Sequence, residues 1–467
     1  MKLKLFNTLT KKLEEFKTLN NDLYVKMYSC GPTVYSYPHI GNMRAYVFTD
    51  TLKRVLLSEG YTVENAINLT DVGHLTDDAN DGEDKLEKAA KKEGNDVFAI
   101  SKFYSEIFFR YLKELNIIDA NYFPKASDYI QEQIHMVEVL TQKGYTYTTS
   151  DGVYFDTAKF PKYKELANIS EEGLAEGFRV AFNDEKRNKT DFALWKFSKP
   201  EDKRQMEWNS PFGVGFPGWH IECSAMILKL LGQQIDIHTG GIDHIPVHHT
   251  NEIAQTEAYT GQKFANFWLH VNFLTPAFKN DGEEEKMSKS LGNIYTIDDL
   301  KSLGYSPSVL KYYYLNSHYR SQLKFNFDIL NSFKSSYVSL KQKVLKIYDQ
   351  QLLSTETELI DYLKEPLLND LNTVVFISRF LEVINNNDIS LQEKKSVIHY
   401  FISITGLNDL LIEDTIMIPE EIINLAEERK QAKINKNYSK SDELRLLILE
   451  KGFLLEDTKE GYIIKQK

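Results

Sequence analysis

Hydrophobic residues in the first part of the chain alternate between short continuous runs and helical stripes. Residues 23–30 form a short apolar run that ends at a Gly-Pro pair, which predicts a buried strand followed by a turn. Residues 44–58 carry hydrophobic side chains at helical spacing, and residues 61–71 predict a second strand. A strand, a helix and a strand within about fifty residues predict a parallel sheet with a crossover helix.

Two helices and a hairpin then interrupt this pattern. A hydrophobic stripe after Asp96 predicts a long helix, and residues 127–143 predict another. A Ser-Asp-Gly sequence lies between two β-rich runs within residues 145–157, which is typical of a hairpin. Residues from about 120 to 210 therefore predict an insertion with a small sheet of its own.

Helix and strand alternate again after the insertion, and beyond about residue 320 the pattern predicts helices only. The expected elements are a helix over 219–231, a strand over 234–238, a helix over 252–259, a strand over 268–274, and helices over 329–347 and 371–384. Pro419 precedes a final short module.

These elements predict an α/β fold class. We expect a Rossmann-like parallel-sheet domain that is split by an α+β insertion and followed by an all-α helical bundle and a small C-terminal module. The chain has 467 residues, which suits about three domains. The predicted segments are 1–120 and 213–275 for the two halves of the parallel-sheet domain, 121–212 for the connective insertion, 276–320 for a connecting region, 321–415 for the bundle, and 416–467 for the last module.

Composition narrows the class of protein. A hydrophobic share of 42% excludes wholesale disorder, and a net charge of −11 argues against a protein coated with basic charge. The N-terminal stretch has no apolar targeting segment, and no apolar run is long enough to span a bilayer. Because two cysteines cannot form a disulfide scaffold, we expect a cytoplasmic protein with reduced thiols and no membrane partner.

Both cysteines are candidate metal ligands. Cys30 ends the first predicted strand and Cys223 lies in a predicted helix, while His248 and Glu252 are one helical turn apart and face the same side. Two thiolates, an imidazole and a carboxylate suit Zn²⁺ better than a hard cation. From spacing alone, inert core cysteines and an exposed His–Glu face remain the better reading, because no CxxC pair is present.

Two short motifs indicate a phosphate-bearing ligand. The sequence PHIGN at 38–42 stands between the first strand and the first helix, where free N–H groups and the helix dipole attract anions. The sequence KMSKS at 286–290 offers two lysines that can neutralise a pyrophosphate. Taken alone, the first motif is an ordinary turn and the second a solvated charge run.

Taken in order, these motifs resemble the signatures of class I aminoacyl-tRNA synthetases: HIGN at 39–42 with Arg44, and KMSKS at 286–290. The finer resemblance is to the cysteinyl-tRNA synthetase family and covers nearly the whole chain. Its further motifs here are CGPTVY (30–35), NLTD (68–71), DFALWK (191–196), PGWHIECSAM (217–226), the stretch 240–249, NEIAQ (251–255), DLNT (370–373) and the stretch 438–457.

The resemblance implies a ligase that activates L-cysteine with ATP and transfers it to the 3′ end of tRNA(Cys). One Zn²⁺ per chain would select cysteine over the nearly isosteric serine by binding its thiolate. Its implied ligands are Cys30, Cys223, His248 and Glu252. ATP, with Mg²⁺, would contact His39, Gly41, Asn42, Gly240, Gly241, Asp243, Lys286 and Lys289, of which His39, Asn42, Lys286 and Lys289 would be catalytic. Cys30, Thr70 and Trp219 would line the cysteine pocket.

The C-terminal stretch is locally basic. Residues 429–445 carry six cations against two carboxylates, and such a face suits RNA phosphates. The resemblance makes residues 416–467 an anticodon-binding module and residues 276–320 the KMSKS loop with its stem-contact region. The implied anticodon contacts are Arg429, Tyr438, Asp442 and Asp457. We expect a monomer with tRNA(Cys) as its macromolecular partner.

Some positions depart from the common pattern of the family. Asn42 replaces a second histidine, and Thr250 replaces a glutamate. His74 follows Asp71 where acidic residues are usual, and nothing in the sequence assigns it a role. Tyr438 replaces an indole, so stacking on an anticodon base would be retained but weaker.

Three other functions compete with this interpretation. GVGFPG at 213–218 is a literal G-x-G-x-x-G that suggests a nicotinamide-dependent dehydrogenase, but Asn-Ser-Pro precedes it where a strand is required. A cysteine ligase acting on an amino sugar would share the catalytic half, but residues 421–467 argue against it because such relatives lack a full anticodon module. A non-catalytic paralogue should have lost His39, Lys289 or a zinc ligand, and all are present.

Overall fold

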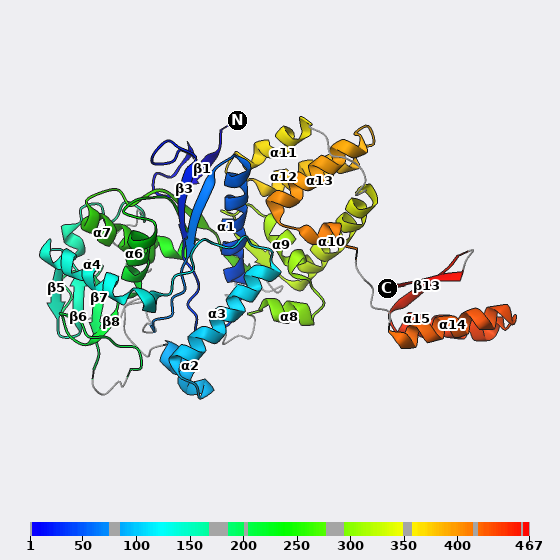
Figure 1. Ribbon diagram of the computed structural model, residues 1–467, viewed down its shortest axis with the longest axis horizontal. Coiled ribbons are helices and arrows are strands. Elements are labelled where there is room, and N and C mark those ends of the chain that lie inside the picture. Colours follow the sequence, from blue (N-terminus) through cyan, green and yellow to red (C-terminus); the bar gives the residue numbers. More distant parts are fainter. Residues whose placement is uncertain are drawn as a thin grey trace, which may run out of the picture. The chain divides into compact units, whose positions relative to one another are not determined.

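The structure is a computed structural model that describes residues 2–73, 85–167, 185–199, 204–276, 294–348, 357–413, 419–458 and 461–466. The chain divides into two compact units, Met1–Leu410 and Leu411–Lys467, and each is described by itself (Figure 1). Among the described residues, no helix combines the length and the apolar character needed to cross a membrane.

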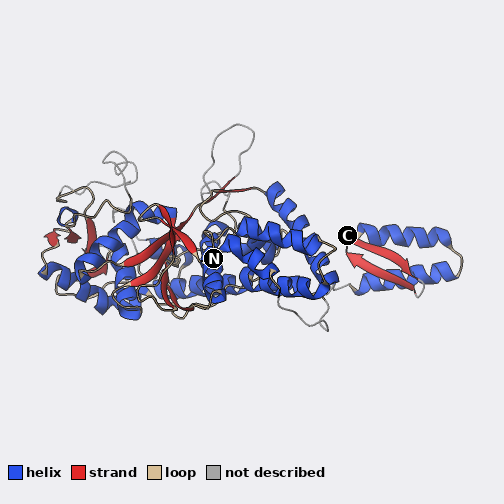
Figure 2. Ribbon diagram, turned by 90° about the horizontal axis from the view of Figure 1, so that it is seen from above, coloured by secondary structure: helices blue, strands red, loops and turns tan. Residues whose placement is uncertain are grey.

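The larger unit is built around a parallel sheet, whose strands are drawn in red in Figure 2. Its strand order is β10-β9-β3-β4. Its strands are β3 (Tyr24–Ser29), β4 (Thr62–Ile67), β9 (Ile235–Gly241) and β10 (Ala265–Val271). Tyr28 in β3 pairs with Ala66 on one side and with His238 on the other. The chain therefore places β4 and β9 on opposite sides of β3, which creates a switch point. Ligands bind at the carboxyl ends of strands at such points in open α/β sheets.

Helix α1 (Ile40–Ser58) follows β3 and begins earlier than the residue 44 that hydrophobic periodicity predicts. His39 and Asn42 cap its start reciprocally, because Asn42 N donates to His39 Nδ1 at 3.2 Å and His39 N donates to Asn42 Oδ1 at 3.0 Å. Further helices that lie between the strands of this sheet in sequence are α2 (Lys85–Glu93), α3 (Val97–Glu114), α6 (Trp219–Leu230) and α7 (Thr250–Thr260), and α2 packs on α3. The long helix predicted after Asp96 is confirmed as α3, and the Asp96 side chain caps its start by accepting from Ala99 N.

The insertion carries an antiparallel sheet and one long helix. Its elements are α4 (Ile130–Gln142), β5 (Thr146–Thr149), β6 (Gly152–Phe155), β7 (Phe192–Phe197) and β8 (Gly215–Pro217). The hairpin predicted at 145–157 is confirmed as β5–β6. Strand β8 pairs with β7 and continues this sheet beyond residue 212, so the GVGFPG stretch contains an edge strand instead of a phosphate-binding turn. Phe155 and Trp195 share one hydrophobic core with Tyr28 of β3, which joins the insertion to the parallel sheet.

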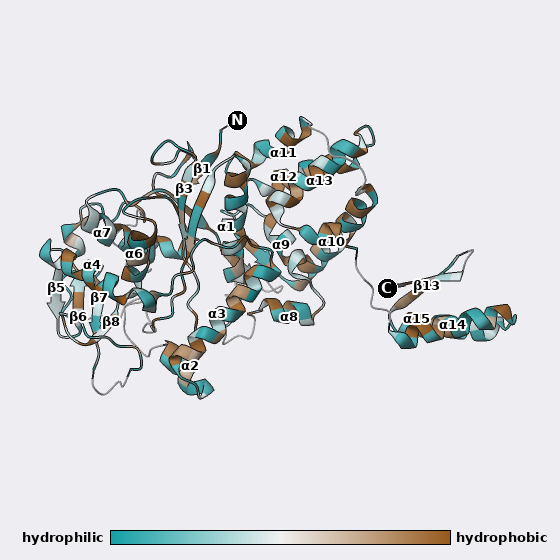
Figure 3. Ribbon diagram, in the orientation of Figure 1, coloured by the Kyte–Doolittle hydropathy of each residue, from teal (hydrophilic) through white to brown (hydrophobic). Residues whose placement is uncertain are grey.

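Helices dominate the rest of the larger unit. They are α8 (Ile297–Ser302), α9 (Pro307–Leu315), α10 (Phe327–Ile347), α11 (Leu359–Leu367), α12 (Thr373–Asn385) and α13 (Leu391–Thr405). Hydrophobic and hydrophilic residues alternate along α10, α12 and α13, as expected for amphipathic helices that cover a core (Figure 3). Asp370 and Leu371 have φ angles of 62° and 53°, so α12 begins at Thr373 and not at the predicted residue 371.

Two small sheets complete this unit. Strands β1 (Lys4–Asn7) and β2 (Lys12–Glu15) form a hairpin, and β11 (Leu274–Pro276) pairs in parallel with β12 (Leu323–Phe325). The expectation of helices only after residue 320 is therefore wrong at β12. The segment is too short for a hydrophobic period to reveal it.

The smaller unit combines two helices with a hairpin. Its elements are α14 (Glu420–Ile434), α15 (Tyr438–Glu450), β13 (Phe453–Thr458) and β14 (Gly461–Gln466), around a core that includes Ile422, Ala426 and Ile448. The hairpin is a second correction to the helices-only expectation. Residues 453–455 are all hydrophobic in sequence, so no alternation marks the strand, although β13 buries Phe453 and Leu455 and exposes Leu454. The predicted α/β class with a split parallel sheet and a following helical region is otherwise confirmed.

Candidate metal centre and nucleotide site

The structure brings all four predicted ligands together at the carboxyl end of β3. Cys30 follows β3 directly, Cys223 lies on α6, and a single π-helical turn (Ile245–His249) carries His248 into α7, where Glu252 follows one turn later. One donor atom from each residue lies within 4.8 Å of all the others. His248 Nε2 is 2.9 Å from Glu252 Oε1 and 3.6 Å from Cys223 Sγ. Because Cys223, His248 and Glu252 are buried, the alternative of an exposed His–Glu face is wrong.

Burial and mutual contacts shift the protonation of this cluster. Burial raises the pKa of the Cys30 thiol well above its usual range, whereas a hydrogen bond from Cys30 lowers the pKa of the Cys223 thiol to about 6. Burial opposes ionisation of Glu252, but the charges of His238 and His248 lower its pKa to about 2. The cluster therefore offers a thiolate and a carboxylate at neutral pH, which are the forms that bind a divalent metal.

Several histidines that the sequence left without a role lie beneath the predicted ligands. His238 Nε2 is 3.0 Å from Glu252 Oε2, and its ring stacks on Trp268 with centroids 4.5 Å apart. His249 Nε2 lies 3.2 Å from Cys30 Sγ, and its Nδ1 is 2.8 Å from His270 Nε2. Burial lowers the pKa of His249 and His270 well below the usual range, so both rings are neutral. The position of His238 at the carboxyl end of a predicted strand was the available signal.

The donor chemistry fits Zn²⁺. Two sulfurs, one imidazole nitrogen and one carboxylate oxygen form a set that this borderline-soft ion prefers. A second group, made of Cys30, His238, His249 and Glu252, also has its donor atoms within 4.8 Å of one another. The first group has two sulfur donors and the second only one, so the predicted set is the better match to a soft metal.

Residues predicted to line the cysteine pocket lie beside this cluster or on the neighbouring strand. Trp219 is the first residue of α6, and the centroid of its ring lies 4.6 Å from that of the His248 ring. Thr70 follows β4, and its hydroxyl accepts a hydrogen bond from Asn68 Nδ2 at 3.1 Å. Thr250, whose role the sequence left open, is buried and donates to the carbonyl oxygen of Ile245 at 2.7 Å, which supports the turn that carries His248.

The predicted nucleotide contacts lie at the ends of β3 and β9. His39, Gly41 and Asn42 form the start of α1 after β3, while Gly240 and Gly241 end β9 and Asp243 follows in a short 3₁₀ turn. A Cβ on Gly240 would lie 2.6 Å from His249 Cε1, and one on Gly241 would lie 2.2 Å from Asp243 Oδ1. The buried His249 ring therefore favours glycine at position 240, whereas the exposed Asp243 carboxylate beside Gly241 can rotate away. Lys286, Lys289 and His74 lie outside the described residues.

Two of the four predicted anticodon contacts bind one another. The Arg429 side chain is 2% exposed and donates to both carboxylate oxygens of Asp457, at 2.8 and 3.1 Å. These bonds, with Lys433, hold the pKa of Asp457 below its usual range. Tyr438 is 63% exposed and begins α15, and Asp442 is also exposed on this helix. The surface open to a partner therefore includes Tyr438 and Asp442 but not the Arg429 guanidinium.

Comparisons with known proteins agree with this geometry. The family model described as "tRNA synthetases class I (C) catalytic domain" matches residues 15–335. A cysteine–tRNA ligase of Treponema denticola is 41% identical and aligns over 98% of both chains. One from Borrelia garinii subsp. bavariensis is 40% identical over 100% of both. A solved Mycobacterium tuberculosis methionyl-tRNA synthetase, in complex with methionyl-adenylate, has a TM-score of 0.56 at 13% identity and covers 83% of this chain and 91% of its own.

A split parallel sheet with a helical region behind it, shared at 13% sequence identity, defines the class I aminoacyl-tRNA synthetase fold. The matched catalytic domain spans well over half of the chain, and relatives at about 40% identity align with nearly all of it. The chain therefore belongs to the cysteine–tRNA ligase family, a family of ligases. The family predicted from the motifs is confirmed, and the dehydrogenase alternative is wrong.

Proposed function

We propose that the chain activates L-cysteine with ATP to give cysteinyl-adenylate and transfers the cysteinyl group to the 3′ end of tRNA(Cys), selecting cysteine through a zinc-bound thiolate. The cluster of the half-buried Cys30 with the buried Cys223, His248 and Glu252 at the switch point carries this proposal. A pocket that selects only by shape separates a thiol from a hydroxyl poorly, since the two differ little in size.

Cys30, Cys223, His248 and Glu252 would hold the metal, which when bound supplies a Lewis acid that prefers a thiolate to a hydroxyl. Glu252 is the weakest donor of the four, and His238 fixes its second oxygen at 3.0 Å. Trp219 and Thr70 would then orient the amino acid so that its carboxylate faces the nucleotide.

Adenylate formation needs positioning and neutralisation of charge. A carboxylate oxygen of cysteine attacks the α-phosphorus of ATP, the bond from this phosphorus to the bridging oxygen breaks, and pyrophosphate leaves with the electron pair. His39 and Asn42 would hold phosphates at the N-terminus of α1, whose N–H groups point outward there. Lys286 and Lys289 would neutralise pyrophosphate, and Mg²⁺ would accompany ATP.

In the second step, a ribose hydroxyl of the terminal tRNA adenosine attacks the carbonyl carbon of the adenylate. The bond to the phosphate oxygen breaks, AMP leaves, and the hydroxyl loses its proton. Tyr438 and Asp442 on α15 would contact the anticodon. Stacking of a base on an exposed tyrosine tolerates any sequence, whereas a carboxylate can accept hydrogen bonds from base edges.

The test is amino-acid-dependent ATP–pyrophosphate exchange in zinc-replete protein. Cysteine should support exchange and serine should not, and attachment of cysteine to tRNA(Cys) should follow. Absence of exchange with cysteine in folded, zinc-loaded protein would refute the proposal.

Cys223→Ser tests the ligand assignment separately. The variant should lose zinc and require more cysteine for half-maximal exchange, because a neutral hydroxyl is a poor zinc ligand. Met226→Leu on the same helix is a matched control, since Met226 is also buried and the swap conserves volume. Stoichiometric zinc and unchanged kinetics in Cys223→Ser would contradict the assignment.

A further inference from the structure

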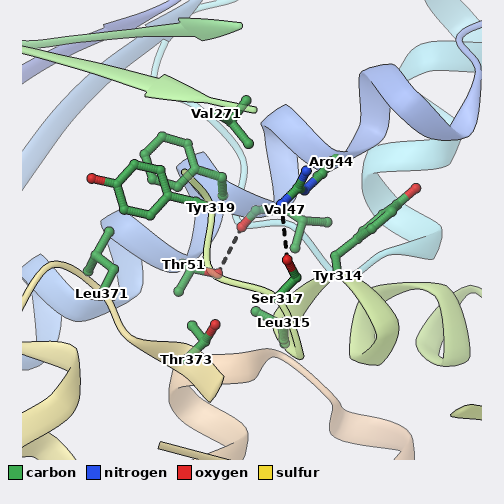
Figure 4. Close-up of a pocket in the computed structure, with 11 residues that line it drawn as sticks. Arg44, Val47, Thr51, Val271, Tyr314, Leu315, Ser317, Tyr319, Leu371 and Thr373 are labelled. Carbon is green, nitrogen blue, oxygen red and sulfur yellow. Dashed lines mark hydrogen bonds between the residues drawn. The ribbon is translucent and has the colours of Figure 1, made fainter. Parts of the chain in front are cut away.

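Arg44 lies near the start of α1, and its guanidinium points toward Ser317 (Figure 4). The residue is 3% exposed. Nη1 donates to the carbonyl oxygens of Asn272 and Phe273, both at 2.8 Å. Nη2 donates to the carbonyl oxygens of His318 at 3.1 Å and Ser321 at 2.7 Å, and to Ser317 Oγ at 3.4 Å. None of these five hydrogen bonds, within the described part of the chain, goes to a carboxylate.

These acceptors belong to two segments that are distant in sequence. Asn272 and Phe273 directly precede β11, and Ser321 stands just before β12, the parallel partner of β11. One side chain on α1 therefore fixes the beginnings of both strands. Strand β11 is also the last described element before residues 277–293, which include the two lysines of the KMSKS sequence.

A second set of bonds ties the other described end of this stretch to the same helix. Ile40 N, the first amide of α1, donates to the carbonyl oxygen of Tyr295 at 2.9 Å. The Tyr314 hydroxyl of α9 donates to the carbonyl oxygen of Ile40 at 2.5 Å. The chain on both sides of residues 277–293 is thus hydrogen-bonded to the first turns of α1, next to the His39–Asn42 cap.

Arg44 is not placed to serve a ligand of its own. The cavity beside it has a volume of about 30 Å³, which admits water but no substrate. Burying a cation without an anionic partner is unfavourable, and a hydrophobic side chain could pack between α1 and the two strands without that penalty. The planar fork of an arginine is, however, suited to holding several carbonyl groups in one fixed arrangement.

We propose that Arg44 is a positioning residue for adenylate formation, which fixes β11 and β12 against α1 beside the HIGN cap, where the nucleotide is proposed to bind. This inference rests on the proposed function, because the consequence of misplacement is a loss of adenylate chemistry. Displacement of a reacting group by about 1 Å lowers rates on the order of 10²-fold.

Arg44→Met and Arg44→Lys, with Arg54→Met as a matched control, test the proposal. Arg54 is also on α1 and is largely buried, with bonds to Asp50, to Ser403 O at 3.0 Å and to Asn116 O at 2.7 Å. None of these partners lies near β11 or β12 in sequence. Arg54→Met should therefore reproduce the loss of a buried arginine from the same helix without disturbing the joint at Arg44.

Exchange kinetics give the first readout. Arg44→Met should lower the rate of cysteine-dependent ATP–pyrophosphate exchange on the order of 10²-fold and raise the KM for ATP more than the KM for cysteine. Arg44→Lys should fall between this variant and the wild type, and it carries the test if Arg44→Met does not fold. Arg54→Met should retain the wild-type KM for ATP at temperatures where it is folded. Equal effects of Arg44→Met and Arg54→Met, or an unchanged KM for ATP in folded Arg44 variants, would overturn the proposal.

Amide hydrogen exchange gives a readout that needs no activity. Peptides covering 269–276 and 317–325 should exchange at least about tenfold faster in the Arg44 variants than in the wild type, and at the wild-type rate in Arg54→Met. Unchanged protection of these peptides from hydrogen exchange in the Arg44 variants would contradict the claim that Arg44 holds β11 and β12. A wild-type chain with no cysteine-dependent exchange would contradict the proposed function, while the hydrogen-exchange comparison would still decide whether Arg44 holds the two strands.

Discussion

A buried salt bridge between Asp50 of α1 and Lys311 of α9 permits a quantitative test of how the larger unit is held together. Their side chains are 0% and 1% exposed, and Lys311 Nζ is 2.9 Å from Asp50 Oδ2. The same oxygen accepts from Arg54 Nε at 2.8 Å, and Asp50 Oδ1 accepts from Ile118 N at 2.9 Å. Asp50 therefore receives three hydrogen bonds and neutralises two cations in a buried place.

Removal of the carboxylate charge should be more harmful than removal of the lysine. Asp50→Asn leaves Lys311 and Arg54 buried without an anion, and we expect a loss of about 3–5 kcal/mol in the free energy of unfolding. Lys311→Met leaves Asp50 with two of its three donors, so we expect a loss of about 1–3 kcal/mol. In the double variant the two losses should not add, and we expect a coupling of about 1–3 kcal/mol.

Urea unfolding followed by tryptophan fluorescence measures these losses, because all four tryptophans lie between residues 195 and 268 in the larger unit. Arg110→Met is a suitable control: its ion pair with Asp298 has side chains 44% and 37% exposed, and a surface pair contributes at most about 1 kcal/mol. Additive losses in the Asp50→Asn, Lys311→Met double variant would refute the reasoning, as would a larger loss from Lys311→Met than from Asp50→Asn.

Two further predictions address the pocket and the RNA contact. Gly31→Ala should destabilise the pocket and lower its zinc content, because the added Cβ would lie 1.5 Å from the carbonyl oxygen of Asn68. Thermal unfolding and metal analysis measure the two effects. A stable, zinc-replete variant would show that the contact relaxes freely. Tyr438→Ala should raise the KM for tRNA on the order of tenfold and leave ATP–pyrophosphate exchange unchanged, since base stacking contributes about 1–3 kcal/mol. Steady-state kinetics of tRNA charging measure the effect. Equal changes in the charging and exchange assays would argue for a structural role of Tyr438.

Local patterns predicted the elements that form from neighbouring residues. The hairpin β5–β6, the helix α3 after Asp96 and the alternation of β3, α1 and β4 all follow from side chains within a few positions of one another. The start of α1 did not follow from periodicity, because the His39–Asn42 cap extends the helix into a polar stretch. Short strands such as β12 depend on pairing with a distant partner and leave little trace in a hydrophobic period.

The candidate metal centre was predictable only in part, for a related reason. The i,i+4 spacing predicts that His248 and Glu252 share a helix face. No local sequence pattern relates either residue to Cys30, which lies more than two hundred positions away. Only the joint order of motifs brought these residues together before the fold was known. Contacts between single residues of distant segments, such as His238 with Glu252 and Arg429 with Asp457, have no periodic signature at all.

The reciprocal cap at the start of α1 changes the interpretation of Asn42. On sequence grounds, its replacement of histidine alters one phosphate contact, but here its side chain accepts from His39 N while its own amide donates to His39 Nδ1. A phosphate held at this N-terminus, as proposed, would accept from the same outward N–H groups. On nucleotide binding, Asn42 N would give up its hydrogen bond to His39 and donate to phosphate instead. Loss of the capping bond would cost free energy, so the helix N-terminus would add less to the affinity for the nucleotide. Asn42 thus belongs to the stability of α1 as well as to the nucleotide site, which gives a physical reason why a small capping side chain can occupy this position.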